Sequence, residues 1–218
     1  ASINPKFIDK CDIIERNINS YKLLELPYIE NISFQQLFSD SNRSTQHLFL
    51  TFIETYRYLS ISIGNLIERK IVHYDIKENN ILYSTKYENP ILIDFGISIS
   101  IDNLTNSNLK QHFYVYAPEY SIWPLEVHII NYILHKGDLT KDSIKDIIKT
   151  YVDNNSIFNY FTDNFREKYI TASINYFSQF LKMDNSTIII KLLDFYDSWD
   201  LYSLSIMYIK FLHKLFKR

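Results

Sequence analysis

Two short segments carry most of the structural information in this sequence: His73-Tyr74-Asp75-Ile76-Lys77-Glu78-Asn79-Asn80-Ile81-Leu82 and Ile91-Leu92-Ile93-Asp94-Phe95-Gly96. In each, polar side chains stand beside short apolar runs, a pattern typical of loops at the ends of buried strands. We expect Asp75 and Lys77 to lie on one side of a short loop, with Asn80 three residues further on. Asp94 should end an apolar strand, and Gly96 should give the backbone freedom to turn beside it.

These side chains predict a particular chemistry. Two carboxylates and a carboxamide supply the oxygen ligands that Mg²⁺ prefers, and the Lys77 ammonium supplies a cation for a phosphate group. The segments offer no cluster of imidazole or thiolate groups of the kind that zinc prefers.

The two segments resemble motifs of the eukaryotic-type protein kinases. Residues 73–80 resemble the catalytic loop H-R-D-L-K-x-x-N, and residues 94–96 resemble the D-F-G motif. Ala117-Pro118-Glu119 resembles the A-P-E motif, and Asp200-Leu201-Tyr202-Ser203-Leu204-Ser205 resembles the start of the central buried helix of the family. Four motifs in the family's order are a far more specific signal than any one of them.

The resemblance implies an α+β, mostly α-helical fold with a kinase-like C-lobe, a remnant of the N-lobe sheet and a large helical insert. We expect residues 1–30 to be the N-lobe remnant and 31–119 the C-lobe with its motifs. Residues 120–199 should form the insert, and 200–218 the central helix.

The resemblance also assigns roles to single residues. It implies an ATP-dependent Ser/Thr protein kinase in which Asp75 accepts the proton of a protein hydroxyl and Lys77 steadies the γ-phosphate. Asn80 and Asp94 would hold Mg²⁺, and Asp200 would anchor the loop backbone. The adenine of ATP would lie against the hinge and the pocket floor, which are formed by Tyr28, Ile29, Glu30, Leu82 and Ile93.

Several positions depart from the family pattern. Tyr74 replaces the catalytic-loop Arg, and His112 stands where Ser/Thr kinases carry a Thr. Three glycines in 218 residues exclude a Gly-rich phosphate loop, and no residue upstream matches the Lys that grips the α/β-phosphates. Because the chain also begins with Ala, we expect a piece of a longer kinase that transfers phosphate negligibly by itself.

Two other classes of function stay open. One is a catalytically inactive scaffold, or pseudokinase, and the other is a small-molecule phosphotransferase of the aminoglycoside or choline kinase type. Lys77 and the A-P-E motif favour the protein kinase, because the small-molecule enzymes typically lack both. The insert is expected to complete the fold or bind a partner protein, since it has no clustered acid or base groups.

Composition narrows the partners. A formal charge of −2 gives no broad basic surface for nucleic acid, and the single cysteine, Cys11, excludes an internal disulfide framework. No apolar run is long enough to span a membrane. We expect a soluble cytoplasmic protein. The abundance of Ile, Asn, Lys and Tyr is typical of an AT-rich genome and resembles kinases of large DNA viruses. If the source is viral, we expect the protein in the host cytoplasm or the virion.

Periodicity predicts the regular elements. We expect a long helix from an N-cap at Ser44 to Glu68 and an exposed loop over residues 98–111. Helices are expected at Leu125–His135, Thr140–Val152, Ile157–Leu181, Thr187–Phe195 and Trp199–Lys217, the last apolar on nearly every face. Short strands are expected at Cys11–Glu15, Tyr21–Ile29, Ile71–Tyr74, Ile81–Tyr83 and Pro90–Ile93.

Overall fold

The computed structural model describes residues 28–39 and 44–216 of the chain. The chain divides into two compact units, Ala1–Glu30 and Asn31–Arg218, and the second holds nearly all of the described residues. Only residues 28–30 of the first unit are described, and they form neither helix nor strand. The strand predicted at Cys11–Glu15 therefore lies outside the described residues. Of the strand predicted at Tyr21–Ile29, residues 21–27 also lie outside the described residues. The prediction is wrong for residues 28 and 29, which are not in a strand.

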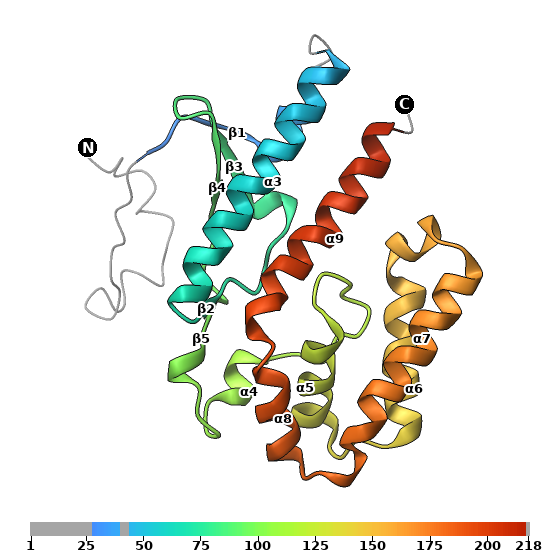
Figure 1. Ribbon diagram of the computed structural model, residues 1–218. Coiled ribbons are helices and arrows are strands. Elements are labelled where there is room, and N and C mark those ends of the chain that lie inside the picture. Colours follow the sequence, from blue (N-terminus) through green and yellow to red (C-terminus); the bar gives the residue numbers. More distant parts are fainter. Residues whose placement is uncertain (1–27, 40–43, 217–218) are drawn as a thin grey trace, which may run out of the picture. The chain divides into compact units, whose positions relative to one another are not determined.

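The second unit is α+β and mostly helical, which confirms this part of the predicted fold class (Figure 1). Its strands are β1 (Asn31–Ser33), β2 (Ile71–Val72), β3 (Ile81–Ser84), β4 (Asn89–Leu92) and β5 (Ile99–Ser100). Its α-helices are α2 (Phe34–Ser39), α3 (Thr45–Glu68), α4 (Leu109–His112), α5 (Leu125–Lys136), α6 (Lys141–Asn154), α7 (Asp163–Ser178), α8 (Asn185–Leu193) and α9 (Tyr196–Phe216). Short 3₁₀ helices are η3 (Glu78–Asn80), η4 (Ile101–Asn103), η5 (Ser156–Tyr160) and η6 (Gln179–Lys182).

Two small antiparallel sheets hold the loops that carry the motifs. The first has the strand order β1-β3-β4, and Ile81 pairs with Leu92 at one end of its ladder. Beyond that pair the backbone N–H of Ile93 donates to the carbonyl of Asn80 at 3.0 Å. The register therefore brings the start of the second motif beside the end of the first. The second sheet pairs β2 with β5, with Val72 opposite Ile99.

Helix α3 follows its sequence pattern closely. Ser44 is its N-cap, and the Ser44 hydroxyl accepts a hydrogen bond from the backbone N–H of His47 at 3.2 Å. Thr55, Leu59 and Ile63 are buried along one face, as their helical spacing predicts. The predictions for α5, α6, α8 and α9 are likewise confirmed apart from residues at the helix ends.

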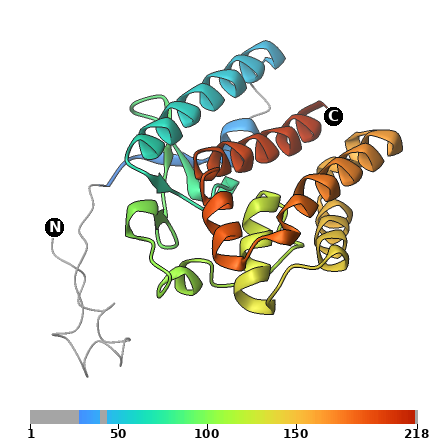
Figure 2. The same cartoon turned by 60° about the horizontal axis from the view of Figure 1, so that its bottom comes forward.

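Helix α9 joins two hydrophobic cores. The helix contributes Leu204 and Phe211 to a core shared with Phe34 of α2 and Leu59 of α3. Trp199, near its start, belongs to a second core, described below. Figures 1 and 2 show α9 lying between α3 and α7. The apolar pattern of this helix thus matches its position between the two cores, although Leu212 near its end is exposed.

The second core unites the segment around Val72 and Tyr74 with the helices of residues 120–199. Val72 and Tyr74 from the loop segment are buried in the same cluster as Ile147 of α6, Leu192 of α8 and Trp199. The helices after residue 120 thus share their apolar interior with the loop.

The prediction of an exposed loop over residues 98–111 is wrong. Ile99 is fully buried, because β5 pairs with β2, and Leu109 is buried at the start of α4. A two-residue strand and a one-turn helix are too short to give a periodic pattern in the sequence.

The prediction of one helix over Ile157–Leu181 is also wrong. The chain forms η5, leaves the helical conformation at Phe161, and begins α7 after Thr162. The Thr162 hydroxyl accepts a hydrogen bond from the backbone N–H of Phe165 at 3.3 Å. This capping signal lies inside a continuous apolar pattern, which concealed it.

Among the described residues, none of the helices combines the length and the apolar character needed to cross a membrane.

Candidate functional site

The backbone of the loop after β2 is anchored by a buried carboxylate of α9. Asp200 of α9 accepts hydrogen bonds from the backbone N–H groups of His73, at 2.6 Å, and Tyr74, at 2.9 Å. Burial raises the pKa of the Asp200 carboxyl, and the two N–H donors act in the opposite direction. The anchoring role implied for Asp200 matches this geometry, which joins residues more than a hundred positions apart.

The Asp75 carboxylate is the centre of the loop. Its Oδ2 accepts hydrogen bonds from Lys77 Nζ at 2.7 Å and from Asn80 Nδ2 at 2.8 Å. The Asn80 amide nitrogen also donates to the Asp75 carbonyl at 3.0 Å. Asp75 and Asn80 are buried and Lys77 is half-buried. The structure thus brings together three of the residues that the sequence selected, and the charged hydrogen bonds fix the carboxylate in one orientation.

Tyr120 is a residue of this cluster that the sequence did not reveal. Its hydroxyl donates to Asp75 Oδ1 at 3.0 Å. Burial and the negative charge of Asp75 both raise the pKa of Tyr120, so the group stays a protonated donor at neutral pH. Tyr120 directly follows the Ala117–Glu119 motif, but no spacing rule marks it, because the contact is made in space across 45 positions.

Asp94 lies beside this cluster through the pairing of Ile93 with Asn80. It adopts a left-handed backbone conformation, with φ of 63°, and its side chain is exposed. Its Oδ1 accepts a hydrogen bond from the Gly96 backbone N–H at 3.3 Å. A Cβ atom at position 96 would come within 3.1 Å of the same oxygen.

The prediction that Gly96 allows the turn beside Asp94 is therefore wrong. The unusual turn lies at Asp94, not at the glycine. A side chain at position 96 would require the Asp94 carboxylate to shift by a few tenths of an ångström. The ring of the neighbouring Phe95 packs with its centroid 4.7 Å from that of the His73 ring.

His73 ties the two motifs together. Its Nδ1 accepts a hydrogen bond from the Asp75 backbone N–H at 3.3 Å, which leaves Nε2 to donate to the Ile93 carbonyl at 3.0 Å. The imidazole is fully buried and has a structural position between the loop and the strand end.

Tyr74 points into the core instead of toward the loops. Its ring stacks on Trp123 with a centroid distance of 4.7 Å, and the Trp123 indole N–H donates to the Tyr74 carbonyl at 2.8 Å. Burial raises the pKa of Tyr74 far above its ordinary range. A neutral phenol fits a place where a charged Arg side chain would be costly.

The residues expected around the adenine are only partly placed. Leu82 lies on β3, and Ile93 directly follows the neighbouring strand β4. Both side chains are half-buried. Tyr28, Ile29 and Glu30 belong to the other unit, and Tyr28 is highly exposed. An adenine site that includes all five residues stays a prediction.

The oxygen donors present fit a hard divalent cation that also binds phosphates. Among the described residues, no three His, Cys, Asp or Glu side chains gather into a cluster that could hold a metal ion alone. The Asn80 amide nitrogen is committed to Asp75, which leaves its Oδ1 oxygen as the ligand atom, and Asp94 adds an exposed carboxylate. Mg²⁺ commonly takes one or two protein oxygens, with phosphates and water completing its shell.

No protein-family model matches the chain. Over 81 residues it is 34% identical to a protein named "Probable serine/threonine-protein kinase cdc7" from Dictyostelium discoideum. The match covers 37% of this chain and 7% of that protein. This partial similarity indicates a kinase-like relationship, and it agrees with the class that the motifs resemble.

Proposed function

We propose that the chain is the catalytic lobe of an ATP-dependent protein kinase that phosphorylates serine or threonine. One observation carries the proposal: the Asp75 carboxylate is oriented by Lys77 and Asn80 on a loop whose backbone is anchored by Asp200. Phosphoryl transfer depends mainly on positioning and on neutralising charge, and this cluster supplies both.

The hydrogen bonds of Asp75 leave room for a substrate hydroxyl. An ionised carboxylate has about four acceptor sites, two on each oxygen. Lys77 and Asn80 fill both sites on Oδ2, and Tyr120 fills one site on Oδ1. The remaining site on Oδ1 accepts the proton-bearing hydroxyl of the acceptor residue and aligns its oxygen for attack.

The phosphates would lie on the Lys77 and Asp94 side of the cluster. The Lys77 ammonium, half-exposed beside Asp75, can contact a transferred phosphoryl group. Asn80 Oδ1 and the Asp94 carboxylate would hold Mg²⁺, which would neutralise the phosphate charge. Lys at position 77 is typical of Ser/Thr kinases, and the similarity to a protein named as a Ser/Thr kinase supports the same acceptor class.

The test measures phosphate transfer from labelled ATP by the natural full-length protein. The substrates are three peptide libraries that differ only in a Ser, Thr or Tyr acceptor. We expect transfer to Ser or Thr, and a loss of about a thousandfold in Asp75→Asn, because that change removes the acceptor for the hydroxyl proton.

Asp146→Asn is the matched control, since Asp146 is an exposed carboxylate on α6. It should keep full activity. Unchanged activity in Asp75→Asn, or transfer to tyrosine alone, would contradict the proposal.

A further inference from the structure

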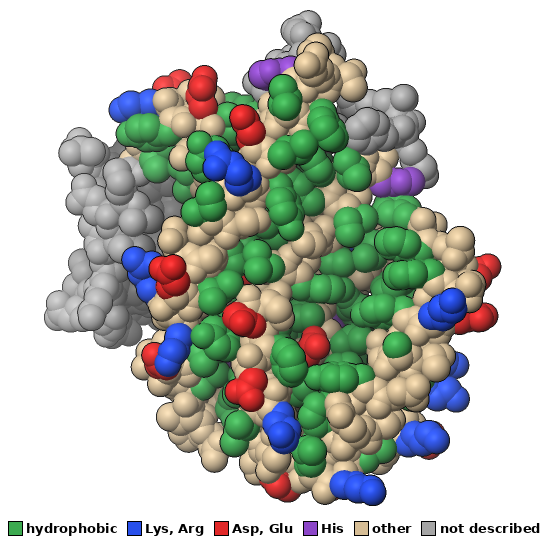
Figure 3. Space-filling model, viewed as in Figure 1, with side chains coloured by type: hydrophobic (Ala, Val, Ile, Leu, Met, Phe, Trp, Pro, Cys, Tyr) green, Lys and Arg blue, Asp and Glu red, His purple; other side chains and the backbone are tan. Residues whose placement is uncertain are grey.

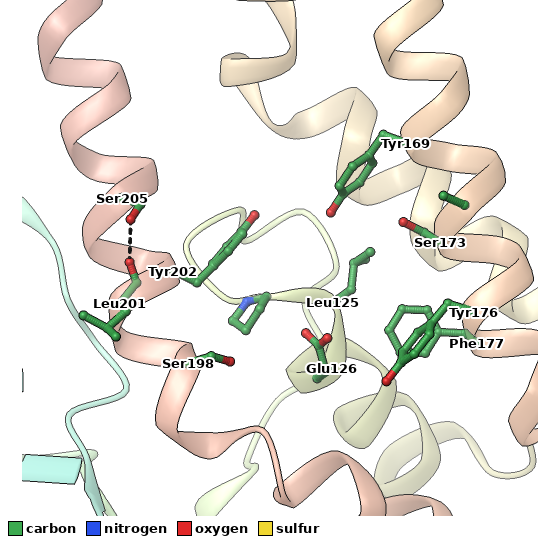
Figure 4. Close-up of a pocket in the computed structure, with 12 residues that line it drawn as sticks. Leu125, Glu126, Tyr169, Ser173, Tyr176, Phe177, Ser198, Leu201, Tyr202 and Ser205 are labelled. Carbon is green, nitrogen blue, oxygen red and sulfur yellow. Dashed lines mark hydrogen bonds between the residues drawn. The ribbon is translucent and has the colours of Figure 1, made fainter. Parts of the chain in front are cut away.

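A cavity of about 610 Å³ lies among α5, α7 and α9, outside the cluster around Asp75. Figure 4 shows its polar lining: the carboxylate of Glu126 at the base, with hydroxyl groups of both neighbouring helices around it. These hydroxyls come from Tyr169, Ser173 and Tyr176 of α7 and from Ser198 and Tyr202 of α9. In Figure 3 hydrophobic side chains surround the surface between α9 and α7.

Glu126 brings a negative charge to this cavity without a counter-charge. Its side chain is half-buried, and burial raises the pKa of its carboxyl. Among the described residues Glu126 forms no ion pair, and its carboxylate accepts a hydrogen bond from its own backbone N–H. The cavity lining contains no Lys, Arg or His. Its place in the first turn of α5 stabilises a carboxylate but does not neutralise it.

The walls suit a positive charge. The rings of Tyr169, Tyr176 and Tyr202 surround the carboxylate, and the face of an aromatic ring attracts cations. Burial raises the pKa of Tyr169 to about 12, and the charge of Glu126 acts in the same direction. The phenols therefore stay neutral, and their oxygens accept hydrogen bonds. Phe177, buried in the lining, adds apolar surface for an alkyl chain.

We propose that this cavity binds a protonated alkylamine, with its ammonium group at Glu126 and its alkyl chain against the aromatic walls. An anionic ligand would be repelled by Glu126, and a neutral one would leave the half-buried carboxylate without a counter-charge. An ammonium group donates up to three hydrogen bonds, which Glu126 and the surrounding hydroxyl oxygens can accept. The volume is that of an ordinary small-molecule site.

Two sources share this chemistry: a free polyamine and the lysine side chain of a peptide. The experiment titrates the 218-residue chain by calorimetry with spermidine and, separately, with a short uncharged peptide that contains one lysine. Both titrations use physiological salt, so that attraction to scattered surface carboxylates is screened. We expect saturable binding of at least one of the two, with one ligand per chain, and the stronger of the two identifies the source.

The variants separate the site from general charge. Glu126→Gln keeps the shape of the side chain and should weaken binding about tenfold or more, because the charged hydrogen bond is lost. Ala172 is an exposed residue of α7 that lines the cavity. Ala172→Phe should fill part of the cavity with a ring and block binding, which provides a second test if Glu126→Gln alters folding. Glu54→Gln is the matched control, since Glu54 is exposed on α3 and outside the cavity.

Several results would overturn the proposal. These are absence of binding for both ligands in the unaltered chain, unchanged affinity in Glu126→Gln or Ala172→Phe, or equal weakening in Glu54→Gln. The proposal does not depend on kinase activity, so neither result decides the other.

Discussion

The segment of residues 71–96, which holds both polar motifs, and the helical segment of residues 120–199 are held in place by different forces. In the first, charged and neutral hydrogen bonds fix single side chains, as Asp200 does for the backbone of His73 and Tyr74. In the second, apolar side chains such as Ile147 and Leu192 are buried together in a shared hydrophobic core.

The two segments nevertheless form one structural unit. Tyr120 donates to the Asp75 carboxylate, and Trp123 donates to the Tyr74 carbonyl. Both residues belong to the region predicted as an insert. A recognisable motif can therefore depend on a neighbouring segment that has no motif of its own. Here the residues in and beside the first motif share their hydrophobic core with the helices of residues 120–199.

The largest effect is expected from removing the anchor of the loop. Asp200→Ala leaves two buried backbone N–H groups without an acceptor, and each such loss costs about 1–3 kcal/mol. We expect the free energy of unfolding, measured in urea, to fall by about 4 kcal/mol. Asp197→Ala removes an exposed carboxylate from the first turn of the same helix, and its effect should stay below about 1 kcal/mol. Equal losses in the two variants would show that the polar anchor is unimportant.

The second effect tests whether the helical segment shares the stability of the loop. Ile147→Ala opens a cavity at a fully buried site and should cost about 3 kcal/mol, whereas Ile190→Ala on the exposed face of α8 should cost little. Unfolding is followed both by far-ultraviolet circular dichroism and by tryptophan fluorescence, which reports Trp123 and Trp199. We expect coincident transitions that shift together in Ile147→Ala. Two separate transitions would mean that the segments fold as independent domains.

A smaller, pH-dependent effect is expected from His128. Burial lowers its pKa to about 4, so between pH 6.5 and 4 the unfolded chain binds a proton that the folded chain does not. Proton binding by the unfolded chain lowers the free energy of unfolding, so stability is unaffected by His128 above pH 6.5 and decreases as the pH falls below it. From pH 7 to pH 5 this decrease amounts to about 2 kcal/mol.

The measurement is the free energy of unfolding at both pH values for the unaltered chain and for His128→Leu. The variant should lose about 2 kcal/mol less than the unaltered chain over this interval. An identical loss in both proteins would mean that burial does not lower the pKa of His128.

Much of this architecture could be predicted from local sequence signals. Ser44 and the helical spacing of Leu59 and Ile63 predict α3, because capping and periodic burial are properties of neighbouring positions. The grouping of Asp75, Lys77 and Asn80 could be predicted for the same reason, since all three stand on one short loop.

The remainder depends on contacts across long sequence distances. Nothing near Tyr120 in the sequence indicates that its hydroxyl reaches Asp75, and nothing near Ile99 indicates that β2 pairs with β5. The cavity at Glu126 is formed where three helices meet, so no single segment carries a signal for it. Glycine is the usual residue for a left-handed conformation, so the sequence points to Gly96, whereas the structure has this conformation at Asp94.

The central claim is that Asp94 and Asn80 bind the metal of a nucleotide complex while Asp75 acts only on the acceptor hydroxyl. The most direct test is calorimetric titration of the natural full-length protein with ATP, with and without Mg²⁺, in Asp94→Ala, Asp75→Asn and the exposed control Asp102→Ala. We predict that Asp94→Ala loses the Mg²⁺-dependent part of ATP binding, whereas Asp75→Asn and Asp102→Ala keep it. Unchanged Mg²⁺-dependent affinity in Asp94→Ala would contradict the account.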